Sequence, residues 1–382
     1  MKNVLIYYNN DNLLYLIEKL KDIYKFKHYS ILKKGERAIY DRYCEVDIFD
    51  SINRFEKNSF DCAFIISESP FVNEMYYELY KFNIKIVYTL NAEYLSTLEN
   101  DNEICNIITK FSLTDKPLIG YIETHVYNQC NLNCKGCTHF SNIDSSNAIS
   151  LESFEKNLSI LSRLYNVNTL RLMGGEPFLN SDLGKYILIA KKYFPNTNID
   201  IATNGLLLTS MPQELIKIIR ENNIAIKVSL YIPINKIMNR LEDFFNRNKI
   251  KHIYGNGCKQ VDDNVLIRKF HKCLTLEKNF DAKYNSRNCF ARECWFLKGS
   301  LLAKCVTPLQ IEIINEKYNV NFEVTNNDFI DISKIKQSSW NEIEKMLSPN
   351  DFCKYCVPME EEYDWEIKNK NQKLEDYIVC RR

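Results

Sequence analysis

The stretch Cys130-Asn131-Leu132-Asn133-Cys134-Lys135-Gly136-Cys137 places three cysteines within eight residues. It follows GYIETHVY at 120–127, an apolar run that predicts a β-strand. Thiolates at this spacing can converge on one face of a loop and hold three irons of a cubane cluster, which normally takes four cysteines. The stretch therefore predicts a [4Fe–4S] cluster whose fourth iron is open to an outside ligand.

A repeated order of strand, loop and helix surrounds this stretch. Further strands are predicted at 169–173, 198–203, 225–232 and 250–254, and helices at 151–165, 182–193 and 212–222. Such a repeat predicts a parallel sheet with right-handed crossovers. In parallel α/β folds the chemistry lies at the C-terminal ends of the strands. The cysteine stretch, GGEP at 174–177, TNG at 203–205 and Ser229 all follow predicted strands directly.

The regions on either side of this repeat have a different character. Apolar runs at 4–8, 62–67 and 84–90 alternate with helical patterns, which predicts a small Rossmann-like α/β domain. No GxGxxG follows the first of these runs, so a dinucleotide site is not expected. The last hundred residues are rich in cysteine and form shorter segments. We predict three domains, which comprise residues 1–112, 116–285 and 286–382.

Composition limits the classes of partner. The chain has 382 residues, and its 50 basic and 49 acidic side chains give a formal net charge of +1. This balance gives no support for a nucleic-acid or anionic-membrane surface. No apolar run approaches the roughly eighteen residues of a membrane span, and no export signal is evident. We expect a soluble, cytoplasmic protein with no nucleic-acid or membrane partner. Its fourteen cysteines then indicate metal or cluster ligation rather than disulfides.

The pattern Cys130-x3-Cys134-x2-Cys137 resembles the signature of radical S-adenosylmethionine (radical SAM) enzymes, over about residues 118–258. The resemblance implies a partial (β/α)6 TIM-like barrel and a [4Fe–4S] cluster whose open iron chelates SAM. Reductive cleavage would release a 5′-deoxyadenosyl radical that abstracts hydrogen from the substrate. An electron donor such as flavodoxin or ferredoxin is implied as well. The family often has an aromatic residue before the third cysteine, whereas this chain has Gly136.

By the same resemblance, residues at the next strand ends bind SAM. Gly174, Gly175, Glu176 and Pro177 stand where the family has its GGE motif, and the Glu176 carboxylate suits the methionine amino group. Asn204 and Ser229 would line the same site, with Ser229 near the ribose hydroxyls. The alternatives are an ordinary Gly-Gly turn, a turn asparagine and a strand-end hydroxyl.

The C-terminal cysteines resemble a twitch or SPASM-type auxiliary cluster domain. Four of the following five would hold a second [4Fe–4S] cluster: Cys289, Cys294, Cys305, Cys353 and Cys356. Gly299 lies between the second and third of them, one residue farther from the third than is usual in SPASM domains. The choice between Cys289 and Cys294 stays open. A tetrahedral zinc site is the alternative, because a CxxC pair with two distant cysteines also satisfies zinc.

The function that these features predict is oxidation or epimerisation of a small molecule, with a sugar or nucleotide-sugar as the candidate class. Cys258, just after the predicted strand at 250–254, is a candidate hydrogen-atom donor, although a lone cysteine is often buried filler. The alternative function is modification of a ribosomal peptide or protein. A non-enzymatic cluster-binding module is disfavoured, because the triad, GGEP and TNG follow successive strands.

Overall fold

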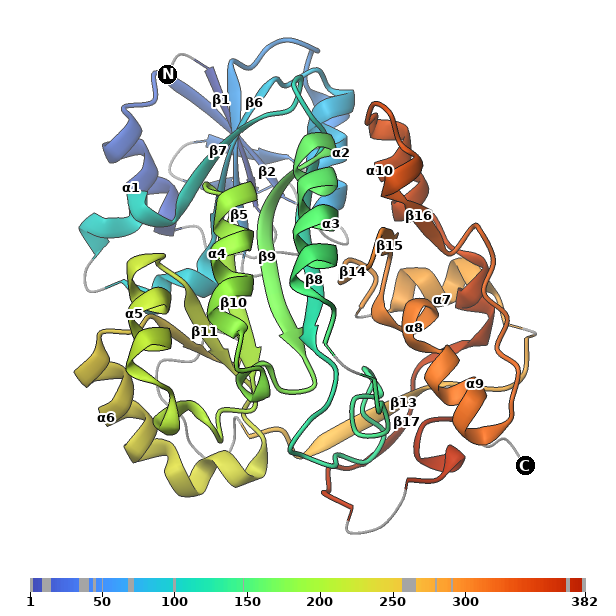
Figure 1. The fold of residues 1–382 in the computed structure, drawn as a ribbon. Coiled ribbons are helices and arrows are strands. Elements are labelled where there is room, and N and C mark those ends of the chain that lie inside the picture. The colour runs from blue at the N-terminus through green and yellow to red at the C-terminus, as the bar shows by residue number, and fades with distance from the viewer. Residues whose placement is uncertain are drawn as a thin grey trace.

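Two large β-sheets and a cysteine-rich C-terminal region make up the chain (Figure 1). The structure is a computed structural model. It describes residues 3–8, 15–33, 41–43, 46–49, 51–67, 72–98, 101–146, 148–255, 266–278, 280–289, 291–368 and 372–379. Cys258, the predicted hydrogen-atom donor, lies outside the described residues.

The N-terminal sheet has seven strands in the order β3-β4-β2-β1-β5-β6-β7. Its strands are β1 (Asn3–Tyr8), β2 (His28–Lys33), β3 (Asp41–Tyr43), β4 (Val46–Phe49), β5 (Cys62–Ser67), β6 (Ile86–Asn91) and β7 (Ile108–Ser112). Two helices accompany it, α1 (Tyr15–Tyr24) and α2 (Asn73–Lys81). The central strands β4, β2, β1, β5 and β6 run parallel, and the two edge strands are antiparallel. Strand β5 is buried along its whole length, as expected for a parallel strand covered on both faces.

The second sheet is open and has eight strands in the order β12-β11-β10-β9-β8-β14-β15-β16. Its strands are β8 (Leu118–Tyr127), β9 (Asn166–Gly174), β10 (Asn198–Thr203), β11 (Ala225–Val228), β12 (His252–Tyr254), β14 (Trp295–Lys298), β15 (Leu301–Ala303) and β16 (Phe329–Asp331). Strands β8 to β12 are mutually parallel, and β14 pairs parallel with β8 from the other side. The crossover helices are α3 (Leu151–Leu164), α4 (Leu183–Tyr193), α5 (Gln213–Glu221) and α6 (Met238–Asn248). The predicted partial barrel is thereby confirmed as an open parallel arrangement.

The C-terminal region packs beside β8 and beyond the C-terminal ends of β8 and β9 (Figure 1). Its helices are α7 (Ala282–Asn288), α8 (Val306–Gln310), α9 (Glu312–Tyr318) and α10 (Trp340–Leu347), and β13 (Lys269–Leu274) pairs antiparallel with β17 (Cys356–Asp364). Strands β14, β15 and β16 lie within the predicted C-terminal domain but extend the barrel sheet. The three domain boundaries stay a prediction.

The N-terminal region joins the barrel through polar contacts. The 3-10 segment η3 (Ala92–Thr97) brings Tyr94 and Glu93 to the barrel strands β10 and β11. The Tyr94 hydroxyl donates to Asp200 Oδ2 at 3.0 Å, and Lys227 Nζ lies 2.6 Å from Glu93 Oε1. The first contact is buried and the second is partly buried, so polar side chains link the two sheets at this point.

Within the part of the chain that the structure describes, no helix combines the length and the apolar character that crossing a membrane requires.

Replacement of Tyr94 by Phe tests this junction. The variant loses one buried hydrogen bond to Asp200, so the free energy of unfolding of the metal-free chain should fall by about 1–2 kcal/mol. The matched control is Tyr80→Phe, because Tyr80 is 41% exposed and stacks on Trp340 through its ring. Urea unfolding measures both variants, and equal losses in the two would contradict the role assigned to Tyr94.

Candidate functional site

The loop with Cys130, Cys134 and Cys137, here called the triad loop, follows β8 and is held in place by the residues around it. Gly136 has a φ of +61°, and a Cβ there would lie 2.2 Å from Tyr363 Oη and 2.5 Å from the Asp376 carbonyl oxygen. The Tyr363 hydroxyl donates to the Lys135 carbonyl at 3.0 Å. Close approach by β17 and the C-terminal segment therefore explains why this chain has glycine where the family often has an aromatic residue.

The Gly174–Gly175 pair packs directly against the chain that leads into the triad. A Cβ at Gly174 would lie 1.8 Å from the Tyr127 carbonyl oxygen, and one at Gly175 would lie 2.1 Å from the Gln129 carbonyl oxygen. The backbone N–H groups of Gly175 and Glu176 donate to these same two carbonyls, each at 2.9 Å. Only glycine fits this approach, so the pair fixes the triad loop in addition to lining the space in front of it.

A cavity of about 340 Å³, here called the triad cavity, lies in front of the three cysteines. It brings together most of the residues predicted to bind SAM, namely Cys130, Cys134, Cys137, Gly174, Gly175, Asn204 and Ser229. Asn204 Nδ2 donates to Asn131 Oδ1 at 2.7 Å and lies 3.8 Å from Cys130 Sγ, which ties the end of β10 to the triad.

Glu176 and Pro177 are buried beneath the triad cavity rather than on its wall. Glu176 is 0% exposed, and its carboxylate accepts hydrogen bonds from the Thr203 hydroxyl at 2.7 Å and the Asn204 backbone N–H at 2.9 Å. Burial raises the pKa of Glu176 to about 7, against the lowering effect of these bonds. In this arrangement the carboxylate holds the turn after β10 in place.

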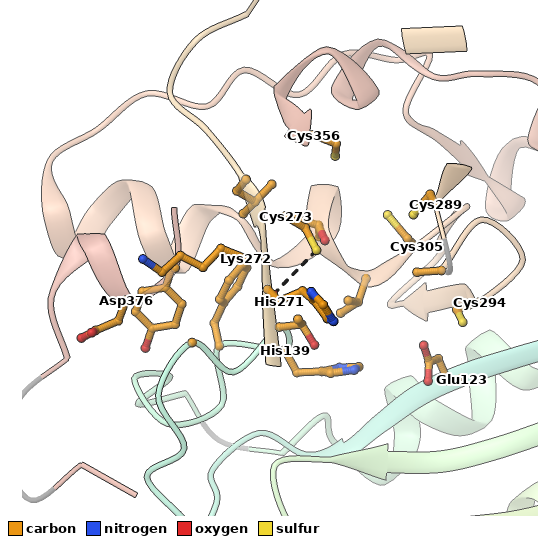
Figure 2. A pocket seen from close by; sticks show the side chains of 18 of the residues that line it. Glu123, His139, His271, Lys272, Cys273, Cys289, Cys294, Cys305, Cys356 and Asp376 are labelled. Carbon is orange, nitrogen blue, oxygen red and sulfur yellow. Dashed lines mark hydrogen bonds between the residues drawn. The ribbon is translucent and has the colours of Figure 1, made fainter. Parts of the chain in front are cut away.

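A second cavity of about 250 Å³, here called the C-terminal cavity, adjoins the first (Figure 2). Its cysteines are Cys273, Cys289, Cys294, Cys305 and Cys356. The two cavities share the lining residues Thr138, His139 and His271, so they lie on either side of one partition. A hydrogen bond holds the His139 side chain of this partition in place, since its Nδ1 lies 2.9 Å from His125 Nε2.

The five cysteines predicted to ligate a second cluster differ in their neighbours. Burial raises the pKa of the Cys356 thiol, and the neighbouring thiols raise it further, those of Cys305, Cys353, Cys289 and Cys273. For Cys294, burial again raises the thiol pKa, but the strongest charged neighbour is the Glu123 carboxylate. Figure 2 shows the sulfur atoms of Cys289 and Cys305 close to one another, whereas Cys294 points toward Glu123.

Cysteine thiolates are the usual ligands of iron–sulfur clusters and also ligate zinc. Among the residues that the structure describes, no set of three or more His, Cys, Asp or Glu side chains is arranged to hold one metal ion. Cys130, Cys134 and Cys137 line the triad cavity. Cys289, Cys294, Cys305 and Cys356 line the C-terminal cavity, whereas Cys353 is not among its lining residues. A buried lysine, Lys304, stands beside the second group: its Nζ donates to Ser286 Oγ at 2.7 Å and to the Leu347 carbonyl at 2.9 Å. Burial lowers the pKa of Lys304, and the nearby thiols of Cys353, Cys305 and Cys289 oppose that shift.

Several cavity residues were not predicted from the sequence. Cys273, on β13, lines the C-terminal cavity and lies 3.7 Å from the His271 carbonyl oxygen. Glu123 and Arg171 line the same cavity from β8 and β9. The available signal was a charged residue inside each of two apolar strand runs, GYIETHVY and TLRLM.

Comparison with known proteins agrees with this geometry. Residues 124–255 match the model of the Radical SAM superfamily. Residues 124–255 therefore form a radical SAM domain, and the predicted resemblance to this superfamily is confirmed. The superfamily implies a [4Fe–4S] cluster and bound SAM for this domain.

Individual relatives match over part of their length. A GTP 3',8-cyclase of Clostridium acetobutylicum is 32% identical over 165 residues, which cover 39% of this chain and 52% of the relative. A GTP 3',8-cyclase of Campylobacter curvus is 28% identical over 216 residues, covering 53% of this chain and 65% of the relative. The chain thus spans about half to two thirds of the length of these two relatives.

Among solved structures, BtrN in complex with AdoMet and 2-DOIA aligns with 69% of this chain and 100% of its own, at 16% identity and a TM-score of 0.38. Streptococcus suis SuiB bound to S-adenosylmethionine aligns with 40% of this chain and 36% of its own, at 17% identity and a TM-score of 0.30.

The contact between Gly175 and the triad loop can be tested by Gly175→Ala. The added Cβ would displace the Gln129 carbonyl and with it the triad, so iron per chain should fall by about four and SAM binding should be lost. The control is Gly299→Ala, because Gly299 also resists a side chain, with φ of +61°, but has nothing within 4 Å of the new Cβ. That control should keep its iron and lose only about 1–2 kcal/mol of unfolding free energy. Iron analysis and equilibrium dialysis with labelled SAM measure both, and full iron with unchanged SAM binding in Gly175→Ala would contradict the assignment.

Proposed function

We propose that this protein is a radical SAM enzyme that uses two [4Fe–4S] clusters to oxidise or epimerise a small molecule, with sugars as the candidate class. The observation that carries the proposal is the pair of cysteine-lined cavities that share one partition. One cluster would be bound beside each cavity. A one-electron donor such as flavodoxin or ferredoxin would reduce the first cluster.

In the triad cavity, the proposed cluster ligands are Cys130, Cys134 and Cys137. When bound there, the cluster and SAM supply a 5′-deoxyadenosyl radical that abstracts hydrogen from the substrate. The protein's own contribution is orientation. Asn204 and Ser229 present polar groups to the ligand, and the buried Glu176 carboxylate holds the Asn204 turn through its backbone N–H.

In the C-terminal region, the proposed ligands of the second cluster are Cys289, Cys305, Cys353 and Cys356. The thiols of Cys289, Cys305 and Cys353 all lie near Cys356, and the orientation of Cys294 toward Glu123 favours these four over Cys294. The charge of Lys304 favours the thiolate form that ligates iron. An auxiliary cluster here could accept an electron from a substrate radical, which is the step that an oxidation requires.

The related GTP 3',8-cyclases support shared SAM chemistry, because the matched family domain is the barrel that holds the triad. They give less support for a shared substrate. The Clostridium acetobutylicum alignment covers 52% of that relative.

Iron and acid-labile sulfide per chain, after anaerobic reconstitution, test the two-cluster proposal. The wild type should hold about eight irons, and the Cys130/Cys134/Cys137→Ala triple variant about four. Cys289→Ala should lower the iron of the second cluster, whereas its matched control Cys294→Ala should retain the wild-type content.

Two results would contradict the proposal. Iron at about four in the wild type, with zinc in the C-terminal region, would make the second site structural. Loss of iron in Cys294→Ala but not in Cys289→Ala would reverse the ligand assignment.

A further inference from the structure

The floor of the C-terminal cavity is a row of charged side chains that crosses the barrel sheet. Strand register pairs Glu123 on β8 with Arg171 on β9, and Arg171 with Asp200 on β10. Paired residues in adjacent strands share a face, so all three side chains stand on one side of the sheet. Glu123 is 6% exposed and Arg171 8%, and both line the cavity.

Within this row, Arg171 is already engaged. Its Nε and its Nη2 lie 2.5 Å and 2.8 Å from the two carboxylate oxygens of Asp200, and its guanidinium lies over the Tyr121 ring at 5.0 Å. This bidentate pair leaves the arginine little capacity for an anionic ligand. Glu123 accepts a hydrogen bond from the Tyr121 hydroxyl at 3.1 Å, which uses one of the several acceptor positions of a carboxylate.

The charges around the floor do not balance. Three buried carboxylates, Glu123, Asp200 and Glu93, accompany two cations, the buried Arg171 and the partly buried Lys227. When all five are ionised, one negative charge is left over, and Glu123 is the carboxylate that reaches the cavity. Burial raises the pKa of Glu123 to about 7. A cation beside this carboxylate would favour its ionised form and balance the row.

The rest of the described cavity wall offers little to a phosphate group. Besides Arg171, the wall has the cationic side chain of Lys272, whose Nζ lies 2.7 Å from Glu361 Oε1. The remaining carboxylate of the wall, on Asp376, lies 2.7 Å from Lys368 Nζ. Among the described lining residues, each cation therefore has a carboxylate partner, whereas triphosphate or diphosphate recognition relies on cations that can turn to the ligand.

We propose that Glu123 binds an ammonium group of the substrate at the floor of the C-terminal cavity. The substrate is then an amine-bearing polar molecule, such as an amino sugar, and not a phosphate ester. This inference rests on the proposed function and narrows its substrate class. The N-terminal region contributes indirectly, because Tyr94 and Glu93 hold the Asp200 and Lys227 side chains that complete the row.

The test uses the reconstituted, chemically reduced holoenzyme with SAM and measures 5′-deoxyadenosine. The probe is a small-molecule extract of the cells that encode the chain, separated by ion exchange into cation-retained, anion-retained and neutral fractions. The cation-retained fraction should stimulate 5′-deoxyadenosine formation severalfold over SAM alone. Stimulation confined to the anion-retained or neutral fraction, or stimulation by no fraction, would overturn the proposal.

Variants of the carboxylate connect this response to Glu123. Glu123→Gln should require about 10- to 100-fold more of the cation-retained fraction for half-maximal stimulation, the loss expected for one charge-assisted hydrogen bond. Glu123→Asp keeps the charge and should respond between the two. The control Glu323→Gln makes the same change at an exposed carboxylate paired with Lys278, and should respond like the wild type. An unchanged response of Glu123→Gln would overturn the proposal.

Iron per chain identifies any variant that fails to fold. In that case the substrate class is still decided by which extract fraction stimulates 5′-deoxyadenosine formation by the wild type. Failure of the proposed function gives a different result: no 5′-deoxyadenosine would form from SAM under any condition, including the reduced enzyme without extract.

Discussion

The parallel pairing of β8 with β9 is the constraint on which both cavities depend. At its C-terminal end, the carbonyls of Tyr127 and Gln129 accept hydrogen bonds from the backbone N–H groups of Gly175 and Glu176. The same carbonyls lie so close to Gly174 and Gly175 that neither glycine has space for a side chain. The triad loop begins at this contact. Toward the middle of the same pair, the register places Glu123 beside Arg171. One strand pairing thus positions the triad cysteines and the floor of the neighbouring cavity.

The buried charges in the barrel give the N-terminal region a physical role. A row of carboxylates and cations inside an open sheet is costly unless each group has a partner. Tyr94 and Glu93, both on η3, supply such partners, because they contact Asp200 and Lys227 directly. The N-terminal region therefore stabilises the polar interior of the barrel.

Much of this arrangement could be predicted from the sequence because it follows from local patterns. Apolar runs predicted the parallel strands, and the triad with the GGEP and TNG motifs predicted one side of the site. The role of Glu176 was less accessible, since its burial depends on how Thr203 and Asn204 turn back toward it. The floor residue Glu123 and the wall residue Cys273 depend on long-range packing. Cys273 reaches the cavity only because β13 pairs with β17, almost ninety residues later in the chain.

The central claim is that the protein binds two iron–sulfur clusters, one beside each of the two adjoining cavities. Anomalous diffraction at the iron edge, from crystals of the anaerobically reconstituted holoenzyme, tests it most directly. The account predicts two iron sites, one beside Cys130, Cys134 and Cys137, and the other among Cys289, Cys305, Cys353 and Cys356. A single iron site at the triad, with a zinc-edge signal or no metal signal among the C-terminal cysteines, would contradict it.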